Sequence, residues 1–340
     1  MKKKPTKGLK VKSDTWFRLI LFPLLFPLSI FYGIAALINK KISALNQVVL
    51  GPPVFSVGNF TVGGTGKTPL VTTLVEILIS IDKEPILISK SYKASLKIPA
   101  EVFADSNVKT VGDEALLLKT KFPNLRVFSG PHKTKTALFA SSKIIDPLAT
   151  VFVVDDGAQH HGFYKDFKIH VWDMSQHKID LFPFPLGKAR EFWFLGEKSD
   201  LTILNRSKSK EVGSNAAIAK VLRAHYSVVN ISSQKNEDLQ GEFVLVSGLG
   251  NFHQLERSVD EFCDNKQCKR LKSVQGKDHD NFDWFKAEVD VNYVCTEKDL
   301  QKLKDKVMVG RLFVVKSEFS EVFKQSFSRV IVNFFKKGEE

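Results

Sequence analysis

The sequence has 340 residues, 43% of them hydrophobic and 26% charged, and a formal net charge of +13. This composition is globular and excludes a wholly disordered chain, and the length exceeds one average domain, so we expect two. The positive charge favours an anionic partner, which leaves nucleic acid, phosphorylated metabolites and an anionic membrane face open.

The chain begins with a basic segment followed by an apolar one. Residues 2–12 carry six lysines, and residues 19–38 hold no charged side chain. A helix over residues 19–38 would be about 30 Å long, enough to cross the hydrocarbon core of a bilayer. Four interpretations compete: a cleaved signal peptide, a spanning helix, a segment that enters one leaflet, and a buried core helix.

We predict the one-leaflet arrangement for residues 1–45. No A-x-A cleavage pattern supports a signal peptide, and the lysines before the segment would place the chain after a spanning helix outside the cytoplasm. Pro23 and Pro27 are expected to kink or break a helix, while Trp16 and Tyr32 suit an anionic headgroup region. The segment is therefore expected to be a monotopic anchor on the cytoplasmic side of a membrane.

The stretch GNFTVGGTGKTPL, residues 58–70, predicts a phosphate-binding loop. It joins a strand-like apolar run to a stretch of helical period. At such a turn, glycines let backbone N–H groups approach phosphate oxygens, and the helix N-terminus adds a favourable dipole. Thr61 stands where the usual P-loop pattern has its first glycine. Lys67 is expected to reach the β- and γ-phosphates of ATP, and Thr68 is expected to ligate Mg²⁺. The residues expected to contact the nucleotide are Gly63, Gly64, Thr65, Gly66, Lys67 and Thr68.

A second apolar run ends in two adjacent acids, Asp155 and Asp156. In a chain with a P-loop, this arrangement favours Mg²⁺ ligation over helix-capping or turn roles. Gln159, His160 and His161 follow as candidates to bind substrate or to orient the two acids. A zinc site is not expected, because no Cys, His or Glu nearby completes a ligand set.

Two further stretches are ambiguous when taken alone. In VGDEALLL, Asp113 and Glu114 begin an apolar-periodic helix, as ordinary capping acids would. In GKDHDNF, Asp278 stands beside His279 in a stretch typical of a solvated turn. A kinase needs a group that orients and deprotonates the acceptor hydroxyl, whereas an ATPase switch needs only a positioned water.

Seven stretches together resemble the tetraacyldisaccharide 4'-kinase family, the membrane-bound lipid A 4'-kinases of Gram-negative bacteria. They match its motifs in order and approximate spacing: VGNFTVGGTGKTP, VGDEALLL, VVDDGAQHH, FPFPLGKARE, LVSGLGN, KDHDNF and VCTEKDLQKL. The resemblance runs from the apolar segment to about residue 315, and Thr61 belongs to the family's own version of the loop. It implies ATP-dependent phosphorylation of the 4'-hydroxyl of an acylated glucosamine disaccharide 1-phosphate, giving lipid IVA, at the cytoplasmic face of the inner membrane.

The resemblance also implies roles for single residues. Asp113 is similar to the family's catalytic base, paired across a cleft with His279, and Glu114 to an additional metal-site acid. A base with a His partner makes physical sense, because a sugar hydroxyl is a poor nucleophile. Asp155 and Asp156 match the Walker B acids. The motif around His279 reads Asp-His-Asp, where the family often has a second His.

The proposed substrate contacts are Gln159, Arg190 and Tyr92. Arg190 is similar to the family's Leu-Arg-Glu position, where an anionic headgroup and a surface ion pair are equal alternatives as partners. The stretch around Tyr92 reads SKSYKAS where the family has an Arg-Gly-Tyr-Gly-Arg-like pattern, so Tyr92 is retained while Lys90 stands for Arg and Ser91 and Lys93 stand for glycines.

Alternating strand-like and helical runs predict an α/β fold. We expect a P-loop NTPase-like parallel-sheet domain over 46–210 and a smaller α/β domain over 211–330 that contributes the Asp-His motif. Two rival functions, a membrane-associated ATPase switch and a nucleic-acid-dependent ATPase, fit the sequence less well. A membrane-associated P-loop ATPase switch typically has a Lys before its Gly-Gly pair, where this chain has Val62. A nucleic-acid partner is not expected, because aromatics do not interleave with a basic stripe.

Overall fold

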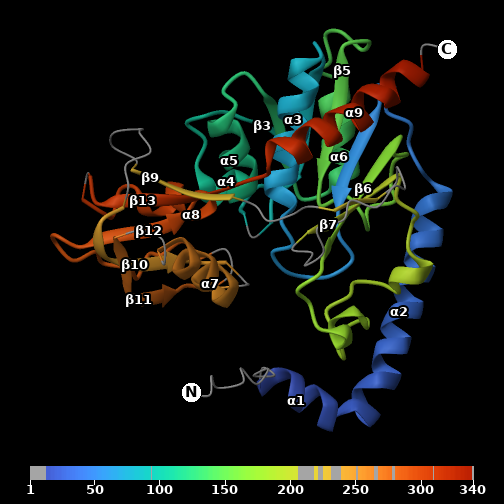
Figure 1. Cartoon of the computed structure of the whole chain (residues 1–340). Helices are drawn as coiled ribbons and strands as arrows, with labels where there is room; N and C mark the ends of the chain where they lie inside the picture. The colour runs from blue at the N-terminus through green and yellow to red at the C-terminus, as the bar shows by residue number, and fades with distance from the viewer. Residues whose placement is uncertain are drawn as a thin grey trace.

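Two β-sheets, one of eight strands and one of five, organise the described part of the chain (Figure 1). The structure is a computed structural model, and it describes residues 13–92, 94–205, 218–220, 225–230, 239–249, 252–263, 267–277, 280–308 and 310–338. Helices pack on both sheets, and most neighbouring strands run parallel. The predicted α/β fold class is therefore confirmed.

The first sheet has the strand order β3-β4-β2-β5-β1-β6-β7-β8, and every pair is parallel except β3 with β4. β1 and β5 are buried along their whole length, as expected of parallel strands covered on both faces. The strands are β1 (Val54–Gly58), β2 (Glu84–Lys90), β3 (Ala100–Val102), β4 (Arg126–Gly130), β5 (Thr150–Asp155), β6 (Phe167–Asp173), β7 (Leu201–Asn205) and β8 (Ile218–Lys220).

Helices cover both faces of this sheet. Successive side chains of a strand point to opposite faces, so alternate residues of these strands enter two different core clusters. α3 (Lys67–Ser80), α5 (Asp113–Lys121) and α9 (Glu321–Lys337) pack into one cluster. α6 (Lys133–Ser141) packs into the other. The four-residue α4 (Val108–Val111) directly precedes α5.

The second sheet has the order β11-β10-β12-β13-β9, and only β9 runs antiparallel to its neighbour. α7 (Phe252–Cys263) packs on one face, while α8 (Glu297–Leu303) follows β12 and packs on the other. The strands are β9 (His225–Asn230), β10 (Gly241–Ser247), β11 (Cys268–Gln275), β12 (Asn292–Thr296) and β13 (Leu312–Glu318).

The chain enters and leaves the second unit through elements that belong with the first sheet. β8 pairs with β7 although it lies beyond residue 210, and Phe323 and Phe327 of α9 are buried in a core cluster of the first sheet. The limits 46–210 and 211–330 stay predictions. In the described residues, the five-stranded unit is inserted between two segments that pack on the eight-stranded one.

α1 (Ser13–Ile20) and α2 (Phe22–Leu45) form an arm beside the first unit (Figure 1). In the described residues, α2 is the one helix long and apolar enough to cross a membrane, with a mean hydropathy of 1.8. The two helices are separated at Leu21. Pro23 follows in the first turn of α2, where the missing N–H of a proline costs little. α2 continues through Pro27, so the expected break at that residue is absent.

One flank of α2 is docked on the protein. The buried Ser29 hydroxyl donates to the carbonyl oxygen of Pro183 (2.8 Å) and accepts from the amide of Leu186 (3.0 Å). A Cβ on Gly33 would lie 2.2 Å from the ring of Phe192, so only glycine allows this approach. These contacts hold α2 against residues 177–196, which include the 3₁₀ helices η1 (Lys178–Leu181) and η2 (Trp193–Leu195).

Candidate active site

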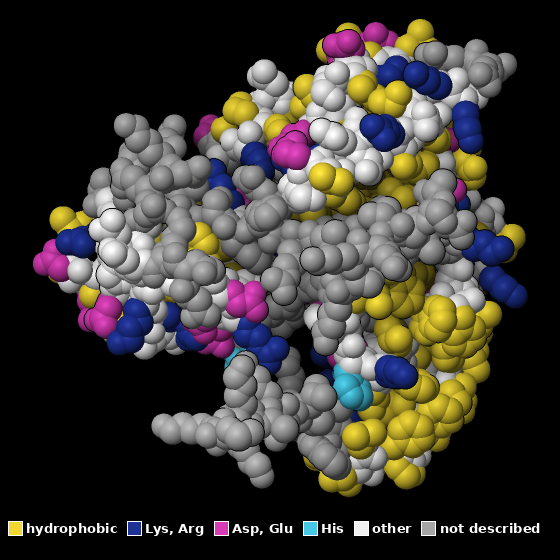
Figure 2. All heavy atoms as spheres, viewed as in Figure 1, with side chains coloured by type: hydrophobic (Ala, Val, Ile, Leu, Met, Phe, Trp, Pro, Cys, Tyr) yellow, Lys and Arg dark blue, Asp and Glu magenta, His cyan; other side chains and the backbone are white. Residues whose placement is uncertain are grey.

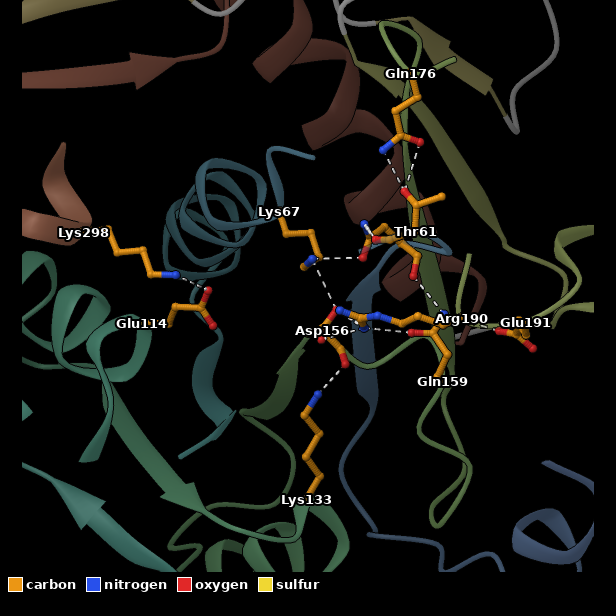
Figure 3. Close-up of polar contacts among 11 residues, drawn as sticks. Thr61, Lys67, Glu114, Lys133, Asp156, Gln159, Gln176, Arg190, Glu191 and Lys298 are labelled. Carbon is orange, nitrogen blue, oxygen red and sulfur yellow. Dashed lines mark hydrogen bonds and ion pairs between the residues drawn. The ribbon is translucent and has the colours of Figure 1, made fainter. Parts of the chain in front are cut away.

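The phosphate loop and the paired acids meet at the carboxyl edge of the first sheet. β1 and β5 are parallel neighbours with Val57 beside Asp155, so the segments that follow them lie together. The Nζ of Lys67 lies 3.3 Å from Oδ1 of Asp156 and donates to Oδ1 of Asn59 (2.9 Å) (Figure 3). The predicted juxtaposition of the loop with these acids is therefore present.

The loop is closed by close backbone approaches. Gly66 precedes α3 with φ +90°, and Gly63 has φ +126°, conformations that favour glycine. Asn205, at the end of β7, donates from Nδ2 to the carbonyl oxygen of Thr65 (2.9 Å). A Cβ on Gly66 would lie 2.5 Å from that same nitrogen. Asn205 was not predicted, although a polar residue at the carboxyl end of a buried parallel strand is a usable signal.

Thr61 has a structural use that a glycine lacks. Its buried hydroxyl donates to Oε1 of Gln176 (3.1 Å) and accepts from Nε2 of the same side chain (2.8 Å). The next amide, that of Val62, donates to the carbonyl oxygen of Lys188 (2.8 Å). The start of the loop is thus tied to residues 176 and 188, and the departure from the usual pattern leaves the turn intact.

Three cations surround the carboxylate of Asp156. Nη1 of Arg190 contacts both of its oxygens (2.8 and 3.0 Å), Lys67 lies 3.3 Å away, and the Nζ of Lys133 donates to its backbone carbonyl. Burial alone would raise the pKa of Asp156, but Lys67, Lys133 and Arg190 outweigh it and hold that pKa well below its ordinary value. Asp156 is therefore ionised at any physiological pH.

Lys133 is a site residue that the sequence reasoning missed. It opens α6 directly after β4, is 7% exposed, and burial lowers its pKa. A lone lysine in PHKTKTALFA has no local signature. Its position after a parallel strand of this sheet is what brings it to the site.

Asp155 behaves differently from its neighbour. Burial, followed by the charges of Glu114 and Asp156, raises its pKa to about 7. Its Oδ1 and the hydroxyl of Thr65 are buried without a hydrogen-bond partner. Unpaired buried oxygens are costly, and carboxylate and hydroxyl oxygens suit Mg²⁺. These oxygen donors are of the kind that magnesium takes. Among the described residues no group of three His, Cys, Asp or Glu side chains encloses a metal, so phosphate oxygens and water would have to complete the ligand set.

Asp113 and Glu114 begin α5, directly after Gly112 with φ +93°. Lys302 donates to Oδ2 of Asp113 (2.8 Å), and Lys298 lies 3.2 Å from Glu114. Both lysines come from α8 of the second unit. His279 and Asp278 lie outside the described residues, so the pairing of Asp113 with His279 stays a prediction.

The predicted substrate contacts divide into two places. Gln159 accepts from Arg190 (3.0 Å) and donates to the backbone carbonyl of Asn59 (2.8 Å), so it lies in the Asp156 cluster (Figure 3). Arg190 forms an ion pair with Asp156 (2.8 Å), and the two side chains are 29% and 30% exposed, so its contact with an anionic headgroup stays a prediction. Tyr92 is 49% exposed and its amide lies near Gly112, beside Asp113.

Comparisons with known proteins agree with this geometry. A family model described as Tetraacyldisaccharide-1-P 4'-kinase matches residues 21–335. A tetraacyldisaccharide 4'-kinase of Bdellovibrio bacteriovorus is 37% identical over 156 residues, 45% of each chain. One from Francisella tularensis subsp. holarctica is 28% identical over 308 residues, covering 85% of this chain and 93% of the relative.

The fold is similar to a crystal structure from Aquifex aeolicus, described as an apo form of LpxK in complex with ATP. The TM-score is 0.74 at 24% identity, and the match covers 94% of this chain and 99% of the other. At that identity the likeness concerns the fold.

Proposed function

The chain belongs to the tetraacyldisaccharide-1-P 4'-kinase family, and from this premise we propose how its residues carry out the reaction. It is a lipid kinase of lipid A synthesis that transfers the γ-phosphate of ATP to the 4'-hydroxyl of a tetraacyldisaccharide 1-phosphate, giving lipid IVA. The observation that carries the assignment of the site is the contact of Lys67 with Asp156, where the phosphate loop meets the paired acids.

ATP is proposed to bind with its phosphates in the loop from Gly63 to Thr68. Backbone N–H groups at the N-terminus of α3 and the Lys67 ammonium would contact the phosphates, with Lys67 leaving Asn59 and Asp156 for the β- and γ-phosphates. Arg190 and Lys133 add positive charge at the same place. Little covalent chemistry is required of the protein, so positioning and charge stabilisation are the main contributions.

Thr68, Asp155 and Asp156 are proposed to hold Mg²⁺, with Glu114 as a further acid. When bound there, Mg²⁺ would neutralise negative charge on the phosphates. The unpaired buried Oδ1 of Asp155 supports this assignment. Ionised Asp156 provides a permanent negative charge beside it.

Asp113 is proposed to accept a hydrogen bond from the acceptor hydroxyl and to take its proton as transfer proceeds. Asp113 begins α5, and the residue after it, Glu114, lies close enough to Asp155 to raise the pKa of Asp155. This position beside the phosphate site supports the assignment of Asp113 as the base. His279 is proposed as its partner. Tyr92 and Gln159 are proposed to contact the sugar or its phosphate, and Arg190 the phosphate being transferred.

The test uses γ-labelled ATP and the acylated disaccharide 1-phosphate in detergent micelles, with Lys67→Ala as the inactive reference. Label is expected on the lipid, and mild hydrolysis should locate it at the 4'-position. Robust ATP hydrolysis with no labelled lipid would instead support the membrane-associated ATPase switch.

We further propose that the enzyme binds the cytoplasmic face of the inner membrane with α2 inserted in one leaflet. A continuous apolar surface runs along α2 (Figure 2) and includes the exposed Leu24, Phe31, Phe184 and Phe194. Because the opposite flank of α2 is docked through Ser29 and Gly33, the helix lies along the protein as a fixed element. An amphipathic contact of this kind is typical of monotopic binding.

Vesicle flotation tests this surface. Phe31→Glu combined with Phe194→Glu should release the protein from anionic vesicles, since charged groups resist burial in lipid. Ile145→Glu is the control, because Ile145 is an apolar residue of the first unit that is more exposed (90%) than Phe31 (71%) or Phe194 (63%). Continued flotation of the double variant would place membrane binding elsewhere.

A further inference from the structure

A buried ion pair links Asp113 to the second unit. The Nζ of Lys302 lies 2.8 Å from Oδ2 of Asp113, and the two side chains are 3% and 6% exposed. Lys298, one helical turn earlier, lies 3.2 Å from Oε1 of Glu114 (Figure 3). It also lies 3.9 Å from the same Asp113 oxygen. Two lysines on one face of α8 therefore meet two consecutive acids at the start of α5.

α8 is held firmly enough to fix these lysines. Thr296 caps the helix, and its hydroxyl donates to Oδ2 of the buried Asp299 (2.7 Å). The same oxygen accepts from the hydroxyl of Ser247 (2.7 Å) and from the amide of Gly248 (3.2 Å), both at the end of β10. The lysine face is thus anchored to the second sheet by a buried polar network.

The same anchor touches the segment that carries the Asp-His motif. A Cβ on Gly248 would lie 2.9 Å from the carbonyl oxygen of Lys277 and 3.4 Å from the amide of Asp280. Asp280 in turn accepts from the amides of Lys277 and Phe282. The positions of α8 and of Lys277 and Asp280, the described residues on either side of the motif, are therefore set by one local structure.

Stability alone does not explain a buried lysine–aspartate pair. Removing two charges from water is costly, and apolar residues of similar volume often serve stability equally well. In phosphoryl transfer the group that receives the acceptor proton must be ionised and aligned with the incoming hydroxyl. A lysine held against one carboxylate oxygen satisfies both needs.

We propose that Lys302 is a positioning residue for the phosphoryl transfer: through its ion pair it holds the Asp113 carboxylate in place and makes that placement depend on the second unit. This inference rests on the proposed role of Asp113. Lys298 holds Glu114 in the same way, as the outer member of the cluster.

The first test compares Lys302→Met and Lys302→Gln with Lys302→Arg. The two uncharged variants should lower kcat roughly 10²-fold, the scale of a misplaced catalytic group, with KM for ATP nearly unchanged. Lys302→Arg should recover at least about tenfold of that loss, because it restores the charge. Lys109→Met breaks the exposed contact of Lys109 with Asp283, another ion pair between the units, and should keep the wild-type kcat.

The second test repeats Lys302→Met in an Asp113→Asn background. If Lys302 acts through Asp113, the added loss there should be under about threefold, because the effects of residues acting as one unit do not add. An equal loss in both backgrounds, or an unchanged kcat in the uncharged single variants, would overturn the positioning role alone. A full rate for Asp113→Asn would overturn the assignment of the base, and with it this inference.

Discussion

The two ends of the active site are built in different ways. At the phosphate end, Lys67, Lys133 and Arg190 reach Asp156 from elements of the eight-stranded unit. At the acceptor end, Asp113 and Glu114 belong to that unit, but their lysine partners belong to the five-stranded one. The phosphate end is formed within the eight-stranded unit alone, whereas the acceptor end forms only when the two units are correctly placed. The difference suggests that nucleotide binding tolerates disturbance of the second unit and that transfer to the acceptor does not.

Replacing Lys67 is expected to have the largest effect and to damage the phosphate end directly. Lys67→Ala should lower kcat/KM by roughly 10³-fold or more, because a charge aimed at the transferred phosphate is lost. The measurement is lipid phosphorylation under subsaturating ATP, together with ATP affinity by calorimetry. Lys97→Ala, an exposed lysine of the same unit, is the control. An unchanged kcat/KM together with an unchanged ATP affinity in Lys67→Ala would mean that the lysine only neutralises Asp156.

Asp113→Asn tests the acceptor end and should separate it from the first. Loss of a general base typically costs 10²- to 10⁴-fold in rate, so we expect a fall of roughly that size in kcat. ATP affinity should change little, because no phosphate contact is removed. The variant also leaves Lys302 buried opposite a neutral amide, so its thermal stability must be measured beside its rate.

The exposed Asp105 provides the control for that variant, since Asp105→Asn removes an exposed carboxylate of the same unit that is not part of α5. If Asp113→Asn loses ATP affinity as much as Lys67→Ala does, the two ends are not separable. ATP binding and phosphate transfer would then depend on the same residues.

Sequence patterns predicted the phosphate end better than the acceptor end. The glycines before Lys67 and the acids after β5 each follow a parallel strand, and parallel neighbours bring such residues to one edge. Lys133 and Asn205 obey the same geometry, but a single lysine or asparagine has no local signature. Nothing in VCTEKDLQKL indicates Asp113 as a partner, because packing between the units creates that contact.

Asp155 offers a pH-dependent test of the phosphate end. Its carboxyl has a folded pKa of about 7 against an ordinary 3.8, so between those values the folded protein keeps a proton that the unfolded chain has lost. Stability attributable to Asp155 therefore falls as pH rises through this window, by at most about 1.4 kcal/mol per pH unit. The window ends near neutral pH, above which no further change from this group is expected.

The measurement is the free energy of unfolding of wild type minus that of Asp155→Asn, across pH 4 to 7 without Mg²⁺. A difference is needed because burial lowers the pKa of His160 to about 3 and that of His170 to about 4. Each of those groups makes stability rise with pH below its ordinary value of 6.5. A flat difference would show that folding leaves the pKa of Asp155 at its ordinary value.

Thr61 gives the smallest expected effect and asks whether the loop depends on side chains outside it. Thr61→Ser keeps the hydroxyl that bonds Gln176 and should behave as wild type. Thr61→Val keeps the shape but leaves Gln176 unpaired, and Thr61→Gly restores the usual P-loop residue while losing both the bond and the buried methyl. Each should lower the free energy of unfolding by about 1 kcal/mol and raise KM for ATP a few-fold, with kcat retained.

An unchanged KM in Thr61→Gly would mean that the phosphate end depends on its glycines and Lys67 alone. A loss confined to kcat would mean that this bond reaches the acceptor end, and the separation of the two ends would fail at the loop itself.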